Sequence, residues 1–312
     1  MSAADVSTRR RFPRISSTAF EHPQDKQALE ALRKIPVLDK VVHKFIELGA
    51  ERYFRVQLLG GAVHVTPKQC PKVYQLFKEA AEILDMHEPD LFLVSSPIVN
   101  AYTFGVDRPF VVLQSGLVDL LSEDELRAVM GHELGHIKAG HVLYRSLVLI
   151  LLQLGSMVVP ITGLASFALR VALADWYRKS ELTADRAELL VCQDLNVSLN
   201  VHMKLAAGSK TIFNQMDSQE FLRQADSYED MDYSTLNKFY KLFREMFLSH
   251  PLPVYRAKEI KQFAESNAFK EIMAGRYPTK DQEVKTRMCP HCGVEVAPSF
   301  FFCPDCGKNT RI

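Results

Sequence analysis

The pentapeptide His132-Glu133-Leu134-Gly135-His136 constrains this chain more than any other feature. Two histidines four residues apart lie on one face of an α-helix, so both imidazoles can reach one metal ion. Glu133 then lies beside the remaining coordination position, where it can take a proton from water. This arrangement is typical of zinc hydrolases. A catalytic zinc usually has a third protein ligand, so a second ligand-bearing segment is expected.

The residues before the pentapeptide predict that it lies in a helix. Ser122 is a suitable N-cap, and Glu125 three residues later completes a capping box. Apolar residues then recur at helical spacing: Leu126, Val129, Met130 and Leu134. The same stretch contains three poor helix formers, Gly131, Gly135 and Gly140. We expect these glycines to permit close approach of a neighbouring element or of substrate.

Glu181 is the best candidate for the third ligand. It belongs to a second predicted helix, from about Ala174 to Cys192, and Asp185 follows it one turn later on the same face. A ligand carboxylate followed by an acid that hydrogen-bonds a ligand histidine suits this spacing. The alternative is that both acids are solvated and pair with Arg178 or Lys179.

The order of these motifs resembles that of the HtpX-like and CAAX-prenyl-protease-like gluzincin metallopeptidases, over roughly residues 71–263. The resemblance implies that His132, His136 and Glu181 bind zinc. It also implies that Glu133 is the general base and acid, and that Asp185 orients a ligand.

The resemblance also indicates residues that would contact substrate. Asn100, Ala101 and Tyr102 are similar to a segment just before the catalytic helix. Residues 100–104 would form an edge strand on which an extended substrate pairs through its backbone. His250 and Arg256 are similar to a family element that stabilises the oxyanion. The alternative for these two is a His-Pro turn at a helix start with a surface arginine.

The expected function is zinc-dependent endopeptidase activity on extended or unfolded segments, with protein quality control at a membrane as one setting. Two other classes remain open. One is another zinc hydrolase, such as an aminopeptidase or an amidase. The other is a non-enzymatic scaffold in which the motif helix is a relic. An intact Glu133 argues against the relic, because a scaffold does not need a base beside zinc.

An uncharged apolar run, residues 146–169, lies between the metal motifs. It is long enough to cross a bilayer once, but a single crossing would separate His136 from Glu181. Pro160 and Gly163 indicate a turn, so a helical hairpin within residues 146–174 is expected. The hairpin would face a membrane surface, a partner subunit or the core.

The C-terminal region contains two CPxCG knuckles, with the cysteines Cys289, Cys292, Cys303 and Cys306. This spacing predicts a structural four-thiolate zinc ribbon. The chain would therefore hold two zinc ions, one catalytic and one structural. Cys70 and Cys192 are isolated and are expected to be small buried residues. Reduced thiols and the lack of an apolar signal segment favour the cytoplasm, with the inner membrane face as an alternative.

The predicted fold class is α+β and helix-rich, with a small antiparallel sheet and the ribbon. Strands are expected at residues 91–94, 101–104 and 110–113, and a helix is expected to start at Pro71. The predicted organisation is a basic flexible tail (1–25), a metallopeptidase domain (26–270), a linker (271–287) and the ribbon (288–312). A net charge of +1 gives no reason to expect nucleic-acid binding.

Overall fold

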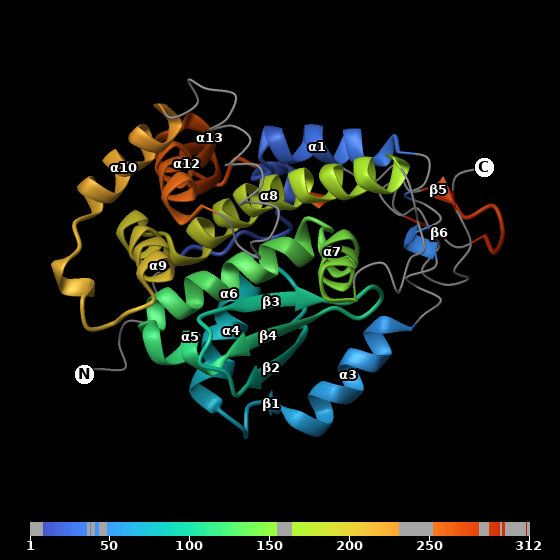
Figure 1. Cartoon of the computed structure of the whole chain (residues 1–312), viewed down its shortest axis with the longest axis horizontal. Coiled ribbons are helices and arrows are strands. Elements are labelled where there is room, and N and C mark those ends of the chain that lie inside the picture. The colour runs from blue at the N-terminus through green and yellow to red at the C-terminus, as the bar shows by residue number, and fades with distance from the viewer. Residues whose placement is uncertain are drawn as a thin grey trace.

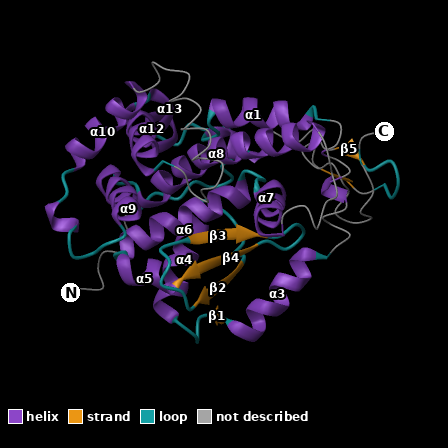
Figure 2. Ribbon diagram, in the orientation of Figure 1, coloured by secondary structure: helices purple, strands orange, loops and turns teal. Residues whose placement is uncertain are grey.

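The computed structural model describes residues 9–35, 38, 41–43, 49–154, 164–230, 252–280, 287–293, 295, 296 and 310. Its helices are α1 (Pro23–Arg33), α3 (Ala50–Gly61), α4 (Pro71–Ile83), α5 (Ser115–Leu120), α6 (Glu123–Lys138), α7 (Val142–Leu154), α8 (Leu164–Cys192), α9 (Leu195–Ala207), α10 (Ser218–Asp230), α12 (Pro253–Glu265) and α13 (Asn267–Met273). Its strands are β1 (Val63–Val65), β2 (Asp90–Val94), β3 (Ala101–Phe104), β4 (Phe110–Gln114), β5 (Arg287–Met288) and β6 (Glu295–Val296). Figure 2 shows the larger sheet as one small group of strands among helices.

The four-stranded sheet is mixed, with the order β1-β2-β4-β3. β1 is antiparallel to β2, and β3 is antiparallel to β4, but β2 and β4 are parallel. The three predicted strands are present, whereas the prediction of a purely antiparallel sheet is wrong. The reason is topological: the chain passes from β2 to the outer position, and the β3–β4 hairpin then returns β4 to a place beside β2. β3 is the outermost of these strands, as expected for residues 100–104.

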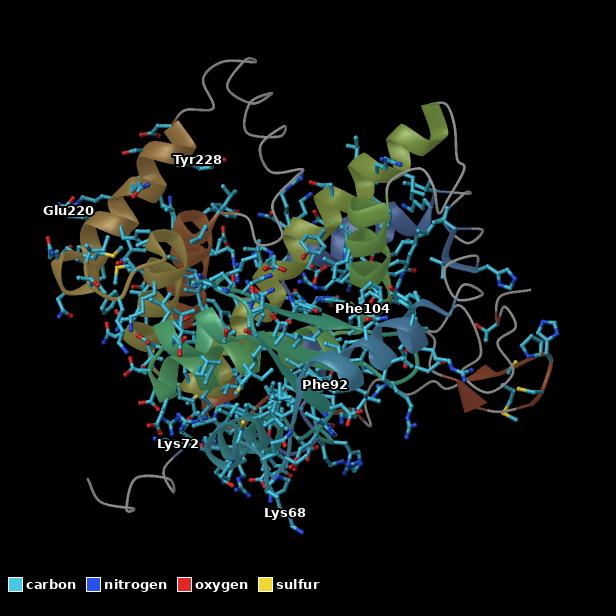
Figure 3. All side chains as sticks on the ribbon, turned by 60° about the horizontal axis from the view of Figure 1, so that its bottom comes forward. Lys68, Lys72, Phe92, Phe104, Glu220 and Tyr228 are labelled. Atoms are coloured by element: carbon cyan, nitrogen blue, oxygen red, sulfur yellow. The ribbon has the colours of Figure 1, made fainter. Side chains whose placement is uncertain are left out.

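Both faces of the sheet are covered. Along β4, Val111 and Leu113 face the core that contains α4 and α6, whereas Phe110 and Val112 face the core that contains α3 and α7. This alternation follows from the two-residue period of a strand. Figure 3 shows Phe92 and Phe104 within the second core, while Lys68 and Lys72 lie on the outside.

The central helix is α6, which contains the His132–His136 motif. It begins with the predicted capping box: the Ser122 side chain accepts a hydrogen bond from the backbone of Glu125, whose carboxylate accepts one from the backbone of Ser122. In Figure 1, α6 lies along the sheet, α8 runs beside α6 on the side away from the sheet, and α1 runs along α8. The motif is therefore enclosed between the sheet and a second helical layer.

Glycines of α6 allow α8 to approach closely. A Cβ atom added to Gly131 would lie 2.6 Å from the Cβ of Val191, and one added to Gly135 would lie 2.5 Å from the Cβ of Ala187. The prediction of close approach is thus confirmed for these two positions. Gly140 differs, because it lies beyond the end of α6. Its φ is +73°, and a Cβ atom added to it would have no neighbour within 4 Å. It ends α6 rather than packing against a neighbour.

Residues 9–25 were expected to belong to a flexible basic tail, and this is wrong. Phe12, Ile15 and Phe20 are fully buried. The backbone N–H of Phe12 donates to the carbonyl of Ile83, at 2.9 Å. Two of the arginines form ion pairs: Arg9 contacts Glu79 and Asp124, and the exposed Arg11 contacts Glu82. Basic composition suggested a tail, but three large apolar side chains anchor the irregular backbone.

The N-terminal segment also meets the end of the helical domain. Ile15 forms an antiparallel bridge with Thr279. The Ser16 N–H donates to the Pro278 carbonyl at 2.9 Å, and the Lys280 N–H donates to the Arg14 carbonyl at 2.9 Å. We call this pairing of residues 14–16 with 278–280 the terminal clasp.

The apolar region between the metal motifs consists of α7 and the first part of α8. Residues 155–163, with the predicted turn at Pro160 and Gly163, lie outside the described residues. α8 ends at Cys192, as predicted, but begins ten residues before the expected Ala174. Among the described residues, no helix combines the length and apolar character needed to cross a membrane.

Candidate metal centre and active site

Three side chains from two helices converge at one point. α6 supplies His132 and His136, and α8 supplies Glu181. The Nε2 atoms of the two histidines are 3.1 Å apart. Glu181 lies 3.5 Å from His132 Nε2 through Oε2 and 3.3 Å from His136 Nε2 through Oε1. All three residues are buried, and one ligand atom from each lies within 4.8 Å of the others.

This donor set fits a zinc ion. Two imidazole nitrogens and one carboxylate are the protein ligands of many catalytic zinc sites, which keep a fourth position open. The outer nitrogen of each imidazole is already engaged: His132 Nδ1 is 3.0 Å from Asp185 Oδ1, and His136 Nδ1 is 3.0 Å from His141 Nδ1. Both Nε2 atoms therefore face the point of convergence, as metal ligation requires.

Asp185 lies where the spacing on α8 predicts, one turn after Glu181 and against His132. Its carboxylate also binds Arg256 of α12, whose Nε donates to Oδ2 at 2.8 Å. The Arg256 Nη1 lies 3.2 Å from Glu181 Oε2. One guanidinium thus fixes both acidic residues. Although burial opposes both charges, the Asp185 carboxylate raises the pKa of Arg256, and the Arg256 guanidinium lowers the pKa of Asp185.

The surroundings of the two histidines shift their pKa values in opposite directions. Burial alone would lower the pKa of His132, but hydrogen bonds to Asp185 and Glu181 raise it to about 9. Burial and the nearby Arg145 cation hold the pKa of His136 well below its usual value. These opposite shifts agree with the short distance between the rings, because two imidazolium cations so close together would repel strongly.

Glu133 lies next to the ligands and is almost fully buried. Its Oε2 atom has no hydrogen-bond partner among the described residues. An unpaired buried carboxylate oxygen is costly, so it points to a group that is satisfied only when water or substrate is present. A carboxylate in this position can accept a proton from water.

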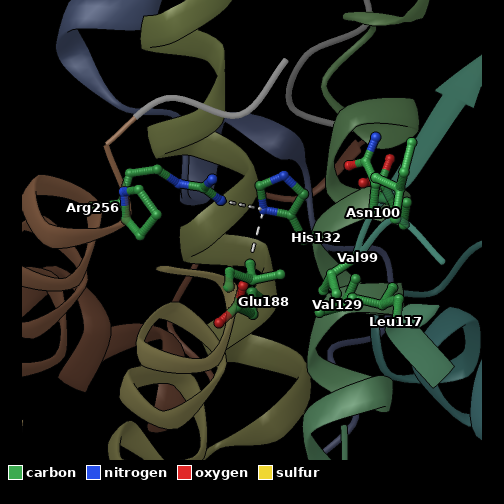
Figure 4. A pocket seen from close by; sticks show the side chains of 12 residues that line it. Val99, Asn100, Leu117, Val129, His132, Glu188 and Arg256 are labelled. Carbon is green, nitrogen blue, oxygen red and sulfur yellow. Dashed lines mark hydrogen bonds and ion pairs between the residues drawn. The ribbon is translucent and has the colours of Figure 1, made fainter. Parts of the chain in front are cut away.

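A cavity of about 170 Å³ opens beside these residues. Its polar lining includes His132, Glu133, Glu188 and Arg256, and its other lining residues are Ile98, Val99, Asn100, Ala101, Leu117, Val129, Leu205 and Pro253. Figure 4 shows Arg256 and Glu188 on one side of His132, with Val99, Asn100, Leu117 and Val129 on the other. The cavity is mostly apolar, with polar groups concentrated at the metal motif.

The structure brings most of the predicted substrate residues to this cavity. Asn100 and Ala101 form part of its wall, and so does Arg256. Tyr102, the next residue of β3, is half-buried on the opposite face of the sheet, in the core that contains α3 and α7. His250 lies outside the described residues.

Sequence reasoning missed several residues around the ligands. Arg145 of α7 is fully buried and donates to Glu181 and to the Tyr177 hydroxyl. In the sequence, the sign of its importance was that Arg145 is the single charged residue of the apolar helix 142–154. His141 and Asp25 form a second contact chain behind His136.

Glu188 and His202 form a further buried pair behind His132. Burial and the neighbouring Asp185 raise the pKa of Glu188 to about 7. Burial lowers the pKa of His202 to about 3. Neither His202 ring nitrogen has a hydrogen-bond partner among the described residues. No local pattern pointed to His202, because α9 is separate from both motifs.

The C-terminal cysteines are described only in part. Cys289 is buried and Cys292 is exposed, and both lie between the short paired strands β5 and β6. Cys303 and Cys306 lie outside the described residues. The four-thiolate ribbon therefore stays a prediction.

Comparison with known proteins agrees with this geometry. The model of peptidase family M48 matches residues 67–264, which include both metal motifs and α12. The chain belongs to peptidase family M48, and it is an HtpX-like metallopeptidase.

Named relatives share different parts of the chain. The plastoglobule-localized metallopeptidase 48 of Arabidopsis thaliana chloroplasts is 38% identical over 265 residues, which cover 84% of this chain and 77% of the relative. A protease HtpX homologue of Moorella thermoacetica is 33% identical over 103 residues, 31% of this chain and 34% of the relative. A protease HtpX homologue of Helicobacter pylori strain Shi470 is 27% identical over 201 residues, which cover 58% of this chain and 63% of the relative. The HtpX matches thus span less than two thirds of those proteins.

Proposed function

We propose that this chain is a zinc-dependent endopeptidase that cleaves extended or unfolded protein segments. One observation carries the proposal: His132, His136 and Glu181 converge next to a buried Glu133 oxygen that has no hydrogen-bond partner among the described residues. When bound, a zinc ion supplies Lewis acidity that activates water and polarises a scissile carbonyl. His132, His136 and Glu181 would hold it.

The chain's own residues would perform the remaining steps. Glu133 accepts a proton from the attacking water and transfers it to the leaving amine. Asp185 and Arg256 keep His132 and Glu181 in position through the contacts described above. His250, as a hydrogen-bond donor to the developing oxyanion, is part of this proposal.

The position of β3 supports an endopeptidase acting on extended segments. Asn100 and Ala101 line the cavity, and the β3 strand runs from this wall along the outer side of the sheet. A substrate aligned with β3 would be recognised mainly through its backbone, so many side chains would be tolerated. Quality control of damaged proteins is the setting that fits such broad recognition.

The Glu133→Gln variant tests the proposal. It preserves the size of the side chain but cannot accept a proton, so we expect unchanged zinc content and loss of casein cleavage. Glu123→Gln, the same change at an exposed residue in the first turn of α6, is the matched control and should cleave normally. Cleavage by Glu133→Gln at the wild-type rate would exclude the mechanism.

Peptide assays separate the alternatives. An aminopeptidase requires a free N-terminus, so acetylation of a test peptide would abolish its cleavage, whereas an endopeptidase would cleave both forms. A scaffold would bind zinc but cleave neither. We retain the endopeptidase because the charged groups of the cavity wall besides Glu133 are already engaged: Glu188 accepts a hydrogen bond from Ser198, and Arg256 binds Asp185 and Glu181.

Contact of residues 146–174 with a membrane surface or a partner subunit, and a cytoplasmic location, are further parts of the proposal. The apolar run of 146–169 supports such a contact. The Arabidopsis relative is named for the plastoglobule and the chloroplast, so location differs within the family. Flotation of the full chain with phosphatidylcholine vesicles would reveal lipid binding.

A further inference from the structure

His141 lies against the outer side of His136. The left-handed backbone of Gly140 ends α6 and turns the chain back, and the His141 N–H then donates to the His136 carbonyl at 3.0 Å. This turn places the two Nδ1 atoms 3.0 Å apart. The His141 ring is also fixed from the other side, where it packs edge-on against Trp176.

The contacts of His141 lead to a carboxylate on the N-terminal helix. His141 Nε2 lies 3.0 Å from Asp25 Oδ2. The Thr183 hydroxyl donates to the same Asp25 oxygen at 2.6 Å, and the backbone N–H of His22 donates to the Thr183 hydroxyl at 3.0 Å. All four side chains from His136 to Thr183 are buried. Thr183 lies two residues after Glu181 on α8, so this chain of contacts returns to the helix that carries the third ligand.

Only one placement of hydrogens satisfies every contact when a metal is bound. His136 must present a lone pair at Nε2, which faces Glu181, so its proton is on Nδ1. That N–H donates to His141 Nδ1, which leaves the His141 proton on Nε2, where it donates to Asp25. A carboxylate only accepts, so the sequence of bonds ends there. The direction of each bond is therefore fixed by Asp25.

A purely structural role explains Asp25 poorly. Asp25 lies in the first turn of α1, where the helix dipole stabilises a carboxylate by about 0.3–1 kcal/mol. A solvated residue would give this benefit, whereas Asp25 is fully buried, and burying a carboxylate costs several kcal/mol unless it is well paired. The contact with His141 accounts for its burial.

We propose that Asp25 is a positioning residue of the metal centre, which acts through His141 to hold His136 in the Nδ1-protonated form that binds metal. The proposal rests on the proposed function only in that zinc is the bound ion. It makes α1, which precedes the region matched by the family model, an integral part of the metal site.

The test compares two carboxylate-to-amide variants on the same helix. Asp25→Asn replaces the buried acceptor, and Glu30→Gln makes the equivalent change at an exposed position. Zinc affinity of the full chain is measured by competition with a chelator. We expect a 10–100-fold loss for Asp25→Asn, the usual effect of removing a group that supports a ligand histidine, and no change for Glu30→Gln. Wild-type affinity in Asp25→Asn would overturn the proposal.

Imidazole nitrogen NMR of the zinc-loaded wild-type protein gives a second measurement that does not depend on folding of a variant. We expect a proton on His136 Nδ1 with coupling across the hydrogen bond to His141 Nδ1. A His136 ring without that proton would overturn the proposal. Neither measurement uses catalysis, so a protein that binds zinc as described but cleaves no peptide would refute the proposed function alone.

Discussion

Gly135 of α6 and Ala187 of α8 lie so close that a Cβ atom on Gly135 would stand 2.5 Å from the Cβ of Ala187. Gly135 directly precedes the ligand His136, and Ala187 lies on the helix that carries Glu181. The contact therefore sets the separation of the two helices at the point where the ligands must meet. The glycine is required by the metal site and not by the helix, which it weakens by about 1 kcal/mol.

Gly135→Ala should separate the two helices. Overpacking of this kind costs about 1–3 kcal/mol of stability. It should also lower zinc affinity, because His136 and Glu181 move apart. Chemical denaturation and chelator competition measure the two effects.

The double variant Gly135→Ala with Ala187→Gly supplies the control. It transfers the methyl group from one helix to the other and should recover most of the zinc affinity. A double variant no better than Gly135→Ala would show that Ala187 is not the limiting contact.

His202→Leu should make the protein more resistant to acid. The folded state holds the pKa of His202 near 3, below its unfolded value of 6.5, so the unfolded state binds an extra proton between these pH values. The stability contributed by neutral His202 is thus complete above pH 6.5 and is lost as pH falls. The wild type therefore loses about 1.4 kcal/mol of unfolding free energy per pH unit for this one proton, and His202→Leu does not. Glu188 is present in both proteins, so the contribution of His202 is the difference between their unfolding free energies as the pH falls from 6.5 to 3. Parallel curves of unfolding free energy against pH for the wild type and the variant would contradict the prediction.

Phe12→Ala should destabilise the protein by about 3–5 kcal/mol, the usual cost of removing a buried phenylalanine. Arg11→Ala removes a neighbouring exposed side chain and its ion pair with Glu82, and should cost less than about 1 kcal/mol. Thermal unfolding compares them. Equal small effects would mean that residues 9–22 are not part of the folded core in solution.

Val129→Phe should narrow substrate selection. Val129 lines the cavity, and the larger ring would fill part of its 170 Å³. Peptides with bulky residues beside the cleaved bond should be cleaved more slowly, whereas peptides with Gly or Ala there should be affected less. Val56→Phe, the same change at an exposed position of α3, should leave the pattern unchanged. A uniform loss across all peptides would indicate misfolding of α6 instead of occlusion.

Cys303→Ser tests the predicted ribbon. If Cys289, Cys292, Cys303 and Cys306 share one ion, the zinc content should fall from two ions per chain to one, and casein cleavage should continue. Elemental analysis of the purified chain gives the ratio. An unchanged number of zinc ions per chain would exclude the four-thiolate ribbon.

The candidate ligands His132 and His136 could be predicted from the sequence because their geometry is local, whereas Glu181 was chosen because it accompanies that motif and because of the resemblance. His132 and His136 are one helical turn apart, as are Glu181 and Asp185, and the capping box identified the helix start. Gly131 and Gly135 also indicated that another element would approach. The residues behind the ligands could not be found this way, because Asp25 and Arg145 reach the site only through tertiary packing. Arg256 was indicated by the resemblance, but as part of an element near the oxyanion and not as the partner of Asp185 and Glu181.

The topology of the sheet was also beyond local patterns. Short runs of strand-forming residues identified β2, β3 and β4, but such runs do not give the spatial order of strands, so the parallel β2–β4 pair was missed. The N-terminal segment failed for a different reason. Phe12, Ile15 and Phe20 bury their side chains from irregular backbone, which has no apolar periodicity to reveal them, while four arginines at positions 9, 10, 11 and 14 suggest a solvated segment.

The terminal clasp has a consequence for how the protein is made. Residues 14–16 leave the ribosome before any helix of the metal centre, whereas their partners at 278–280 emerge only after α12 and α13. Arg256, which holds Glu181 and Asp185, is also translated late. A nascent chain thus carries both metal motifs before Arg256 and residues 278–280 have emerged, so the metal centre would gain the last of these supports only after α12 and the clasp have formed.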